Sequence, residues 1–182
     1  MLEVPVLIAK AADGLGNKSV HDLRVAFRRC RSMADGFRTV DPDKRWKKMR
    51  RLATSVFDSL GALRDCQVMM EWLEKLGGAD DPVARELTEQ LRRQESELKQ
   101  QAESALKSFD GKQWQIWSSG LPLRARRLPL GSETFQTLAL EKLNAARKLQ
   151  TPALKTLAVP AFHRLRIGLK KFRYVVENFL PQ

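Results

Sequence analysis

The stretch VHDLRVAFRRCRSMADGFR, residues 20–38, recurs near the other end of the chain as FHRLRIGLKKFRYVVENFL, residues 162–180. A shift of 142 positions aligns His21 with His163 and Arg24 with Arg166. These two histidines are the only ones in the chain, and they occupy the same place in both copies. An internal repeat of this kind predicts a fold made of two related halves.

Both copies have the pattern of an amphipathic helix with one basic face. On a helical wheel the basic residues of each copy fall within about 80° of one another, with the apolar residues roughly opposite. The basic faces comprise His21, Arg24, Arg28 and Arg31 in the first copy, and His163, Arg166, Lys170 and Arg173 in the second. The apolar stripes comprise Leu23, Phe27, Cys30, Ala34 and Phe37, and then Leu165, Leu169, Phe172 and Phe179. No acidic residue interrupts either basic row, although like charges at this spacing disfavour a helix. A solvated surface could account for one such row, but the duplication favours an anion-binding face.

A third basic row is expected on the helix that follows the first copy. Residues 44–51, KRWKKMRR, contain six cations and no acid. Helical spacing separates Trp46 and Met49, on the side expected to be buried, from the other side of the helix. That other side carries Lys44, Lys47, Lys48 and Arg51.

The remaining pattern predicts an all-α fold of antiparallel helix pairs, without strands. The expected helices are 19–38, 43–60 ended by Gly61, 66–76 capped by Asp65 and ended by Gly77–Gly78, Asp80–Asp81–Pro82 to Phe109, 132–149, and one from Pro160 onward. Thr151–Pro152 is expected to end the helix at 132–149, before a short helical turn at 153–157. Residues 110–131 look irregular, with Trp114 and Trp117 as packing anchors and a loose basic cluster at Arg124, Arg126 and Arg127. The chain is therefore expected to form one domain, 1–182, with a first half at about 17–109, a linker at about 110–131 and a second half at about 132–182.

The net charge of +12 predicts a polyanionic partner: nucleic acid, an inorganic phosphate polymer or an anionic membrane. Two cysteines without close spacing disfavour a disulfide framework or a metal knuckle. The first residues lack the pattern of a signal peptide, and no apolar run is long enough to span a membrane. We therefore expect a soluble cytoplasmic protein without a membrane partner.

Three functions remain open on the residues alone. A flexible polyanion could lie along the basic rows, with arginine forks on its oxygens and with histidines that become protonated as it binds. Nonspecific nucleic-acid binding is the alternative, although exposed aromatic residues for base stacking are not evident among the charges. A metal-dependent phosphohydrolase built on His21–Asp22 is a second alternative, which would need carboxylates as its further ligands. No motif demands catalysis, a metal or a cofactor.

The motifs VHDLRVAFRRCRS, LGALRD at residues 60–65 and FHRLRIGLKKFRYVVE together resemble the CHAD domain, the conserved histidine α-helical domain family. The resemblance implies two pseudo-symmetric helical bundles around a basic cavity, and non-catalytic binding of inorganic polyphosphate. It also implies that polyphosphate contacts the basic rows of both repeat copies and of the 43–60 helix. Association with polyphosphate granules is an option within the cytoplasmic location expected above.

One departure from the family pattern concerns the second half. The repeat continues in the family into a further basic helix, whereas this chain stops at Pro181–Gln182. We therefore expect a C-terminally short member with an incomplete second half. Apolar residues of the last helix would then lack cover, and self-association through them is a further expectation.

Overall fold

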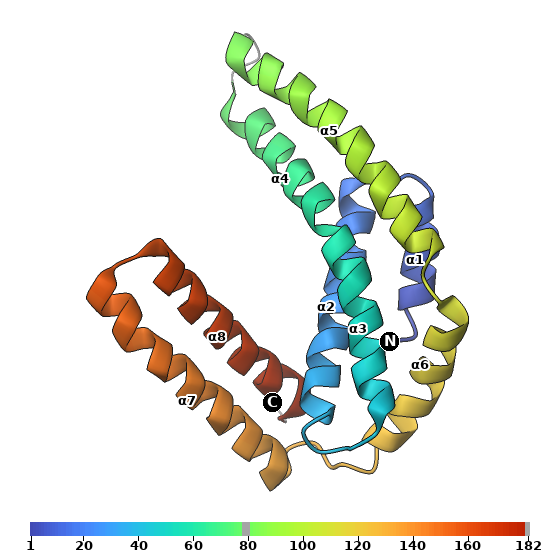
Figure 1. Ribbon diagram of the computed structural model, residues 1–182, viewed down its shortest axis with the longest axis vertical. Helices are drawn as coiled ribbons and strands as arrows, with labels where there is room; N and C mark the ends of the chain where they lie inside the picture. Colours follow the sequence, from blue (N-terminus) through green and yellow to red (C-terminus); the bar gives the residue numbers. More distant parts are fainter. Residues whose placement is uncertain (78–80, 181–182) are drawn as a thin grey trace. The chain divides into compact units, whose positions relative to one another are not determined.

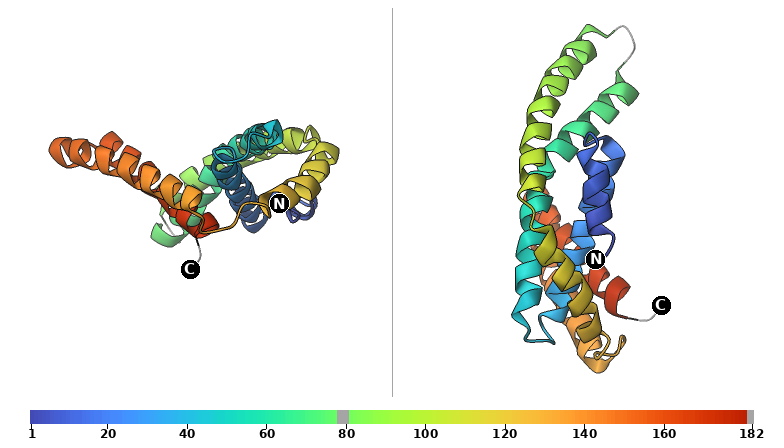
Figure 2. Two further views of the ribbon diagram at one scale, coloured as in Figure 1. Left: turned by 90° about the horizontal axis from the view of Figure 1, so that it is seen from below. Right: turned by 90° about the vertical axis from the view of Figure 1, so that its right-hand side faces the viewer.

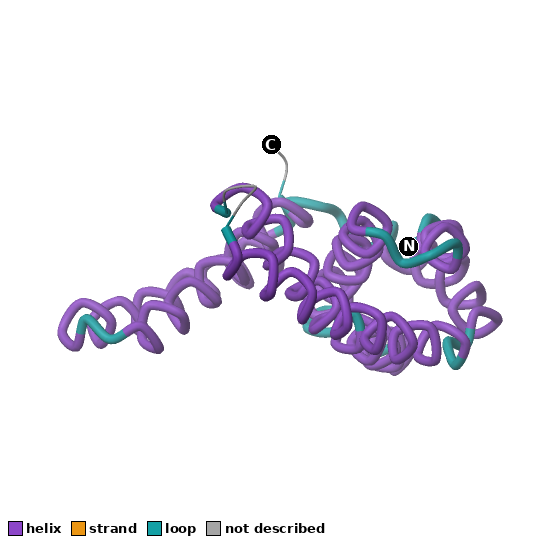
Figure 3. The backbone as a smooth tube through the Cα atoms, turned by 90° about the horizontal axis from the view of Figure 1, so that it is seen from above, coloured by secondary structure: helices purple, strands orange, loops and turns teal. Residues whose placement is uncertain are grey.

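The computed structural model describes residues 1–77 and 81–180, and every regular element within them is a helix (Figures 1 and 3). The expected all-α class is confirmed. In chain order the helices are α1 (Val4–Ala12), α2 (Asn17–Phe37), α3 (Lys44–Ser59), α4 (Gly61–Leu76), α5 (Pro82–Lys107), α6 (Gly111–Ala125), α7 (Glu133–Thr156) and α8 (Val159–Phe179). Gly78, Asp80 and Pro181–Gln182, which entered the sequence expectations, lie outside the described residues.

The chain divides into two compact units, each made of two separate stretches of sequence. The first unit contains Met1–Arg31 and Lys48–Ser119, and the second contains Ser32–Lys47 and Gly120–Gln182. The last residues of α2 and the first residues of α3 therefore belong with the second unit, as does the end of α6.

An aromatic cluster lies in the core of the first unit. The rings of Phe27, Phe109 and Trp114 meet edge-on or tilted, with centroids 5.5–5.9 Å apart. Trp114 and Trp117 are buried, as expected of packing anchors, and the Trp114 Nε1–H group donates to the carbonyl oxygen of Met1 at 3.2 Å. These contacts bring α2, α6 and the first residues of the chain onto one core.

Helices α4 and α5 of the first unit pack side by side and antiparallel (Figure 2). Asp81 starts α5, because its side chain accepts hydrogen bonds from the backbone N–H groups of Val83 and Ala84. Two buried groups of α4 reach across the unit. Gln67 donates to the Leu15 carbonyl oxygen at 2.9 Å, and the Cys66 thiol lies 3.3 Å from the Leu91 carbonyl oxygen.

The core of the second unit is a stack of aromatic rings. Phe37 stacks on Trp46 with centroids 4.7 Å apart, and Phe135 stacks on Phe179 at the same distance. Phe37 meets Phe179 edge-on at 5.1 Å, which joins the two stacks. Gly36 leaves the space that the Phe179 ring occupies, because a Cβ atom at this position would overlap the ring.

Helices α7 and α8 form an antiparallel hairpin in the second unit (Figure 1). Small buried residues line the contact. They are Ala146 and Ala153 on α7, and Ala161 and Gly168 on α8. A Cβ atom on Gly168 would lie 3.4 Å from the Ala146 Cα atom, so the helices approach closely. The small side chains are what allow this approach.

Three element predictions were wrong at helix boundaries. Helix α4 begins at Gly61, so Gly61 does not end a helix and Asp65 does not cap one. The pattern misled because Leu60 and Leu63, both fully buried, let α4 follow α3 almost directly. Pro152 does not break its helix either: α7 runs through it to Thr156, and the buried Ala153 anchors the next turn.

Two further helices were not expected. Helix α1 lies before the repeat, with Pro5 in its first turn, where a missing N–H group costs little. Most of the predicted irregular linker at 110–131 is α6, which contains Pro122. Within the described residues, no helix is both long and apolar enough to cross a membrane.

Candidate anion-binding faces

The basic face of α2 is graded from half-buried to exposed. Arg24 and Arg31 are half-buried, whereas His21 and Arg28 are exposed. The gradient follows from helical geometry: Arg24 and Arg31 are seven residues apart and border the buried stripe, while Arg28 lies about 40° further from it. The first two arginines are therefore partly covered by the protein, and Arg28 is open to solvent.

Arg24 and Arg31 converge on one side chain of α3, that of Phe57. The Arg24 guanidinium carbon lies 4.1 Å from the Phe57 ring centroid, and that of Arg31 lies 4.6 Å from it. Arg24 Nη1 also donates to the Phe57 carbonyl oxygen at 2.7 Å. Burial lowers the pKa of the Arg24 guanidinium, and the nearby Asp65 carboxylate opposes that effect. An arginine nonetheless remains charged at neutral pH.

An acidic group borders this cluster. A carboxylate oxygen of Asp58 lies 3.8 Å from Arg31 Nη1, and the Asp58 side chain is mostly exposed. A loose, exposed ion pair of this kind contributes little to stability. It does place a competing carboxylate beside a cation of the candidate site.

The predicted basic row of α3 is exposed, but it occupies another side of that helix. Lys44, Lys47, Lys48 and Arg51 are all exposed. At 100° per residue they lie between about 80° and 180° around the helix from Phe57. The α3 row is therefore a separate strip of positive charge and does not converge on the Phe57 cluster.

The side chains of the corresponding row on α8 are more exposed than those of the row on α2. His163, Arg166 and Arg173 are exposed, and Lys170 is half-buried. Arg173 pairs with Glu177 at 3.3 Å and lies over the Tyr174 ring at 5.3 Å, both on its own helix. The residues that correspond to Arg24 and Arg31 are thus exposed in the second copy.

The apolar stripes of the two copies also differ. All of the α2 positions are buried, namely Val20, Leu23, Phe27, Cys30, Ala34 and Phe37. At the corresponding positions of α8, Phe179 is buried, Leu165, Phe172 and Val176 are half-buried, and Phe162 and Leu169 are exposed. The α2 row lies in the first unit and the α8 row lies in the second.

Arg124 does not belong to a loose basic cluster, contrary to the sequence prediction. It lies near the end of α6, and its Nε and Nη2 atoms donate to the two carboxylate oxygens of Asp41. Hydrogen bonds from Arg124 hold the pKa of Asp41 well below its usual range. Arg124 is therefore a structural partner of the α2–α3 turn in the second unit.

Sequence reasoning missed Phe57 and Asp58 as parts of the α2 site. In the sequence, Phe57 looks like an ordinary apolar residue of α3, because residue type alone does not show that its ring faces two arginines. One signal was present: two arginines seven residues apart at the border of an apolar stripe need a partner on the neighbouring helix.

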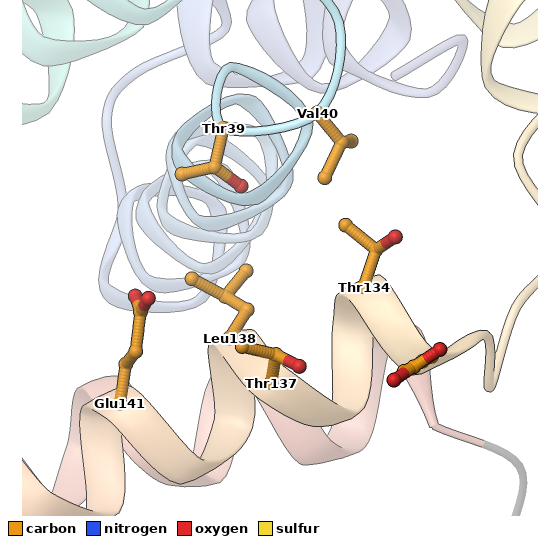
Figure 4. Close-up of a pocket in the computed structure, with 7 residues that line it drawn as sticks. Thr39, Val40, Thr134, Thr137, Leu138 and Glu141 are labelled. Carbon is orange, nitrogen blue, oxygen red and sulfur yellow. The ribbon is translucent and has the colours of Figure 1, made fainter.

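One pocket of about 360 Å³ lies in the second unit, between the turn after α2 and helix α7 (Figure 4). Its lining consists of Thr39, Val40, Glu133, Thr134, Thr137, Leu138 and Glu141. The charged groups of this lining are carboxylates, which repel phosphate oxygens. The pocket is therefore not a site for a polyanion.

Within residues 1–77 and 81–180, no group of three or more histidine, cysteine, aspartate or glutamate side chains is placed to hold a metal ion. Asp22, the acid of the His21–Asp22 pair, accepts a hydrogen bond from Lys18 Nζ at 3.0 Å. That interaction lowers the pKa of the Asp22 carboxyl. Asp22 thus forms an exposed ion pair with Lys18 on α2.

Comparisons with curated proteins and with solved structures found no significant match. The family model described as the CHAD domain matches residues 8–182, which is nearly the whole chain. The matched range includes both basic copies, α3 with Phe57, and the LGALRD segment. The chain therefore belongs to the CHAD domain family.

Proposed function

We propose that this protein binds inorganic polyphosphate, without catalysis, through the basic faces of α2, α3 and α8. One observation carries the proposal furthest. Arg24 and Arg31 are gathered on the Phe57 ring, with the exposed Arg28 between them on the same face of α2. A row of ordered and extended arginines suits a chain of closely spaced anionic groups, and membership of the CHAD family favours polyphosphate as that chain.

The energetics of such binding are those of a polyelectrolyte. Each contact between an arginine and a phosphate releases a condensed counterion, so affinity falls as salt rises. Guanidinium groups offer several donors in a planar fork that suits phosphate oxygens, while the lysines supply point charges. The net charge of +12 adds long-range attraction for any polyanion.

Nucleic acid carries the same phosphate groups as polyphosphate, but it also has bases that a binding site must hold. Single-stranded nucleic acid is usually held by exposed aromatic rings on which bases stack. At the α2 face the ring of Phe57 is occupied by two guanidinium groups. We therefore propose that the protein prefers polyphosphate over DNA and RNA. We further propose that it acts in the cytoplasm, in association with polyphosphate granules.

Competition at one salt concentration tests this preference. Labelled polyphosphate is bound to the protein, and its fluorescence anisotropy is followed as unlabelled polyphosphate, single-stranded DNA or RNA is added. Polyphosphate should displace the label at far lower phosphate equivalents than either nucleic acid. Equal displacement by all three would replace the proposal with nonspecific polyanion binding.

A matched pair of variants separates the faces from net charge. Arg28→Glu with Arg166→Glu reverses one exposed arginine on the α2 face and one on the α8 face, and Arg92→Glu with Arg93→Glu makes the same charge change on α5. The first pair should lose most of the affinity for polyphosphate and the second should lose little. Similar losses in both would mean that only total charge matters.

The non-catalytic part of the proposal has its own assay. Release of inorganic phosphate from polyphosphate is measured with and without common divalent cations. Metal-dependent release that disappears in His21→Ala would support a phosphohydrolase instead.

A further inference from the structure

Phe57 contacts two cations of the α2 face. Its half-buried ring has the Arg24 guanidinium at 4.1 Å and the Arg31 guanidinium at 4.6 Å from its centroid. The two arginines leave α2 at points about 10.5 Å apart along the helix axis. Their guanidinium carbons can be separated by no more than the sum of the two distances to the ring. The side chains thus converge on Phe57 instead of extending in parallel.

Holding two like charges near one another requires compensation. The face of an aromatic ring carries partial negative charge and attracts guanidinium groups. The hydrogen bond from Arg24 Nη1 to the Phe57 carbonyl oxygen fixes one of the two groups further. Phe57 therefore contacts Arg24 twice, through its ring and through its backbone carbonyl, and contacts Arg31 once, through its ring.

We propose that Phe57 is a positioning residue of the anion site: it holds Arg24 and Arg31 in place to receive neighbouring phosphate groups of one polyphosphate chain. The inference rests on the proposed function and adds to it a residue that carries no charge. Arginine has a long side chain, and ordering it on binding costs conformational entropy. Phe57 orders the two arginines before the ligand binds, so this entropy cost does not reduce the affinity for the ligand.

The test compares Phe57→Leu with Phe57→Tyr. Leucine keeps an apolar side chain at this position but has no ring face for the guanidinium groups, whereas tyrosine keeps the ring. Affinity for labelled polyphosphate is measured over a series of salt concentrations for each variant. Phe57→Leu should bind about tenfold more weakly, because Arg31 then loses its ring contact and Arg24 keeps only its hydrogen bond to the backbone carbonyl of residue 57. Both side chains are then less ordered before the ligand binds. Its plot of log affinity against log salt should also become shallower, as fewer cations engage phosphate. Phe57→Tyr should restore both quantities.

Phe109→Leu is the matched control. Phe109 is also half-buried, and its ring contacts Phe27 and Trp114 rather than a cation. Unfolding curves for both leucine variants show whether they remain folded. If Phe57→Leu does not fold, Phe57→Met replaces it, because methionine is flexible and fills core space without a ring.

The outcomes distinguish this inference from the proposed function. If wild type binds polyphosphate and Phe57→Leu binds it equally well, or if Phe109→Leu loses as much affinity, the positioning role is refuted and the function stands. If wild type shows no preference for polyphosphate, the proposed function itself fails. A loss in Phe57→Leu that disappears when Arg24 and Arg31 are both glutamine would confirm that Phe57 acts through these two arginines.

Discussion

Arg124 and Asp41 are joined by two parallel hydrogen bonds, from Nε to Oδ2 at 2.9 Å and from Nη2 to Oδ1 at 2.7 Å. Asp41 is only 8% exposed, and it also accepts a hydrogen bond from the Trp46 Nε1–H group at 2.9 Å. The pair connects the turn between α2 and α3 to the end of α6 within the second unit. These donors stabilise the charged form of Asp41, which makes stability depend on its ionisation.

The pH dependence of folding should reflect this carboxylate. The pKa of Asp41 is lower in the folded protein than in the unfolded chain, where it is about 3.9. Its contribution is therefore complete above that unfolded pKa, and it is lost as pH falls through the folded pKa. Asp41→Asn should lower the free energy of unfolding at neutral pH by about 1–3 kcal/mol and reduce the acid sensitivity. Urea unfolding at a series of pH values measures both effects.

Asp35→Asn is the control for that experiment. Asp35 is exposed and lies 3.3 Å from the partly exposed Arg38, so its replacement should change stability by less than about 0.5 kcal/mol. An Asp41→Asn protein with the same acid sensitivity as wild type would contradict the assignment.

A side chain at Gly36 should destabilise the protein. A methyl group there would overlap the Phe179 ring, which is itself held by Phe135 and Phe37. Gly36→Ala should therefore cost about 1–3 kcal/mol in thermal or urea unfolding, through displacement of the ring stack. Gly16→Ala, at a position with open space around its Cβ direction, should have little effect. Equal stability of the two variants would rule out close packing at Gly36.

Asp58 should weaken the proposed polyphosphate site. Its carboxylate lies 3.8 Å from Arg31 Nη1, where it competes with an incoming phosphate. Asp58→Asn should raise the affinity for polyphosphate by about two- to fivefold, as expected for loss of one exposed ion pair. Asp35→Asn makes the same change in net charge on α2 away from the Phe57 cluster, and it should raise affinity less. The idea fails if binding titrations give equal increases for both.

The exposed apolar residues of α8 should promote self-association. Phe162 and Leu169 are 41% and 47% exposed, although their counterparts Val20 and Phe27 are fully buried. Burying such residues against a second copy would remove apolar surface from water. Sedimentation should show a mass that rises with protein concentration, and Phe162→Ser with Leu169→Gln should abolish the rise. Leu87→Gln, at an exposed leucine of α5, should leave it unchanged; a monomer at every concentration would contradict the prediction.

Residue spacing was enough to predict the helices that carry the basic rows. In α2 the buried residues recur every three or four positions, and the structure buries that stripe. Asp81–Pro82 marked the start of α5 correctly, because an acidic cap and a proline in the first turn are local chemistry. Features set by neighbouring residues were therefore visible in the sequence.

Features set by distant residues were not visible. Pro152 looked like a helix breaker, but buried Ala153 keeps the following turn within α7. Arg124 looked like a surface cation, because its partner Asp41 is 83 residues away. Phe57 became part of the site only because α3 places it against two arginines of α2. In each case tertiary packing decided what the local pattern left open.

Both native thiols are inaccessible, with Cys30 and Cys66 only 2% and 1% exposed, and burial raises the pKa of each. Maleimide dyes react with exposed thiolates, so the wild-type surface should be nearly inert to them. Cysteines introduced at the exposed Arg92 of α5 and Lys148 of α7 would then be the reactive sites. A donor–acceptor dye pair on those two positions could follow the distance between the units as polyphosphate is added, with both native cysteines left in place.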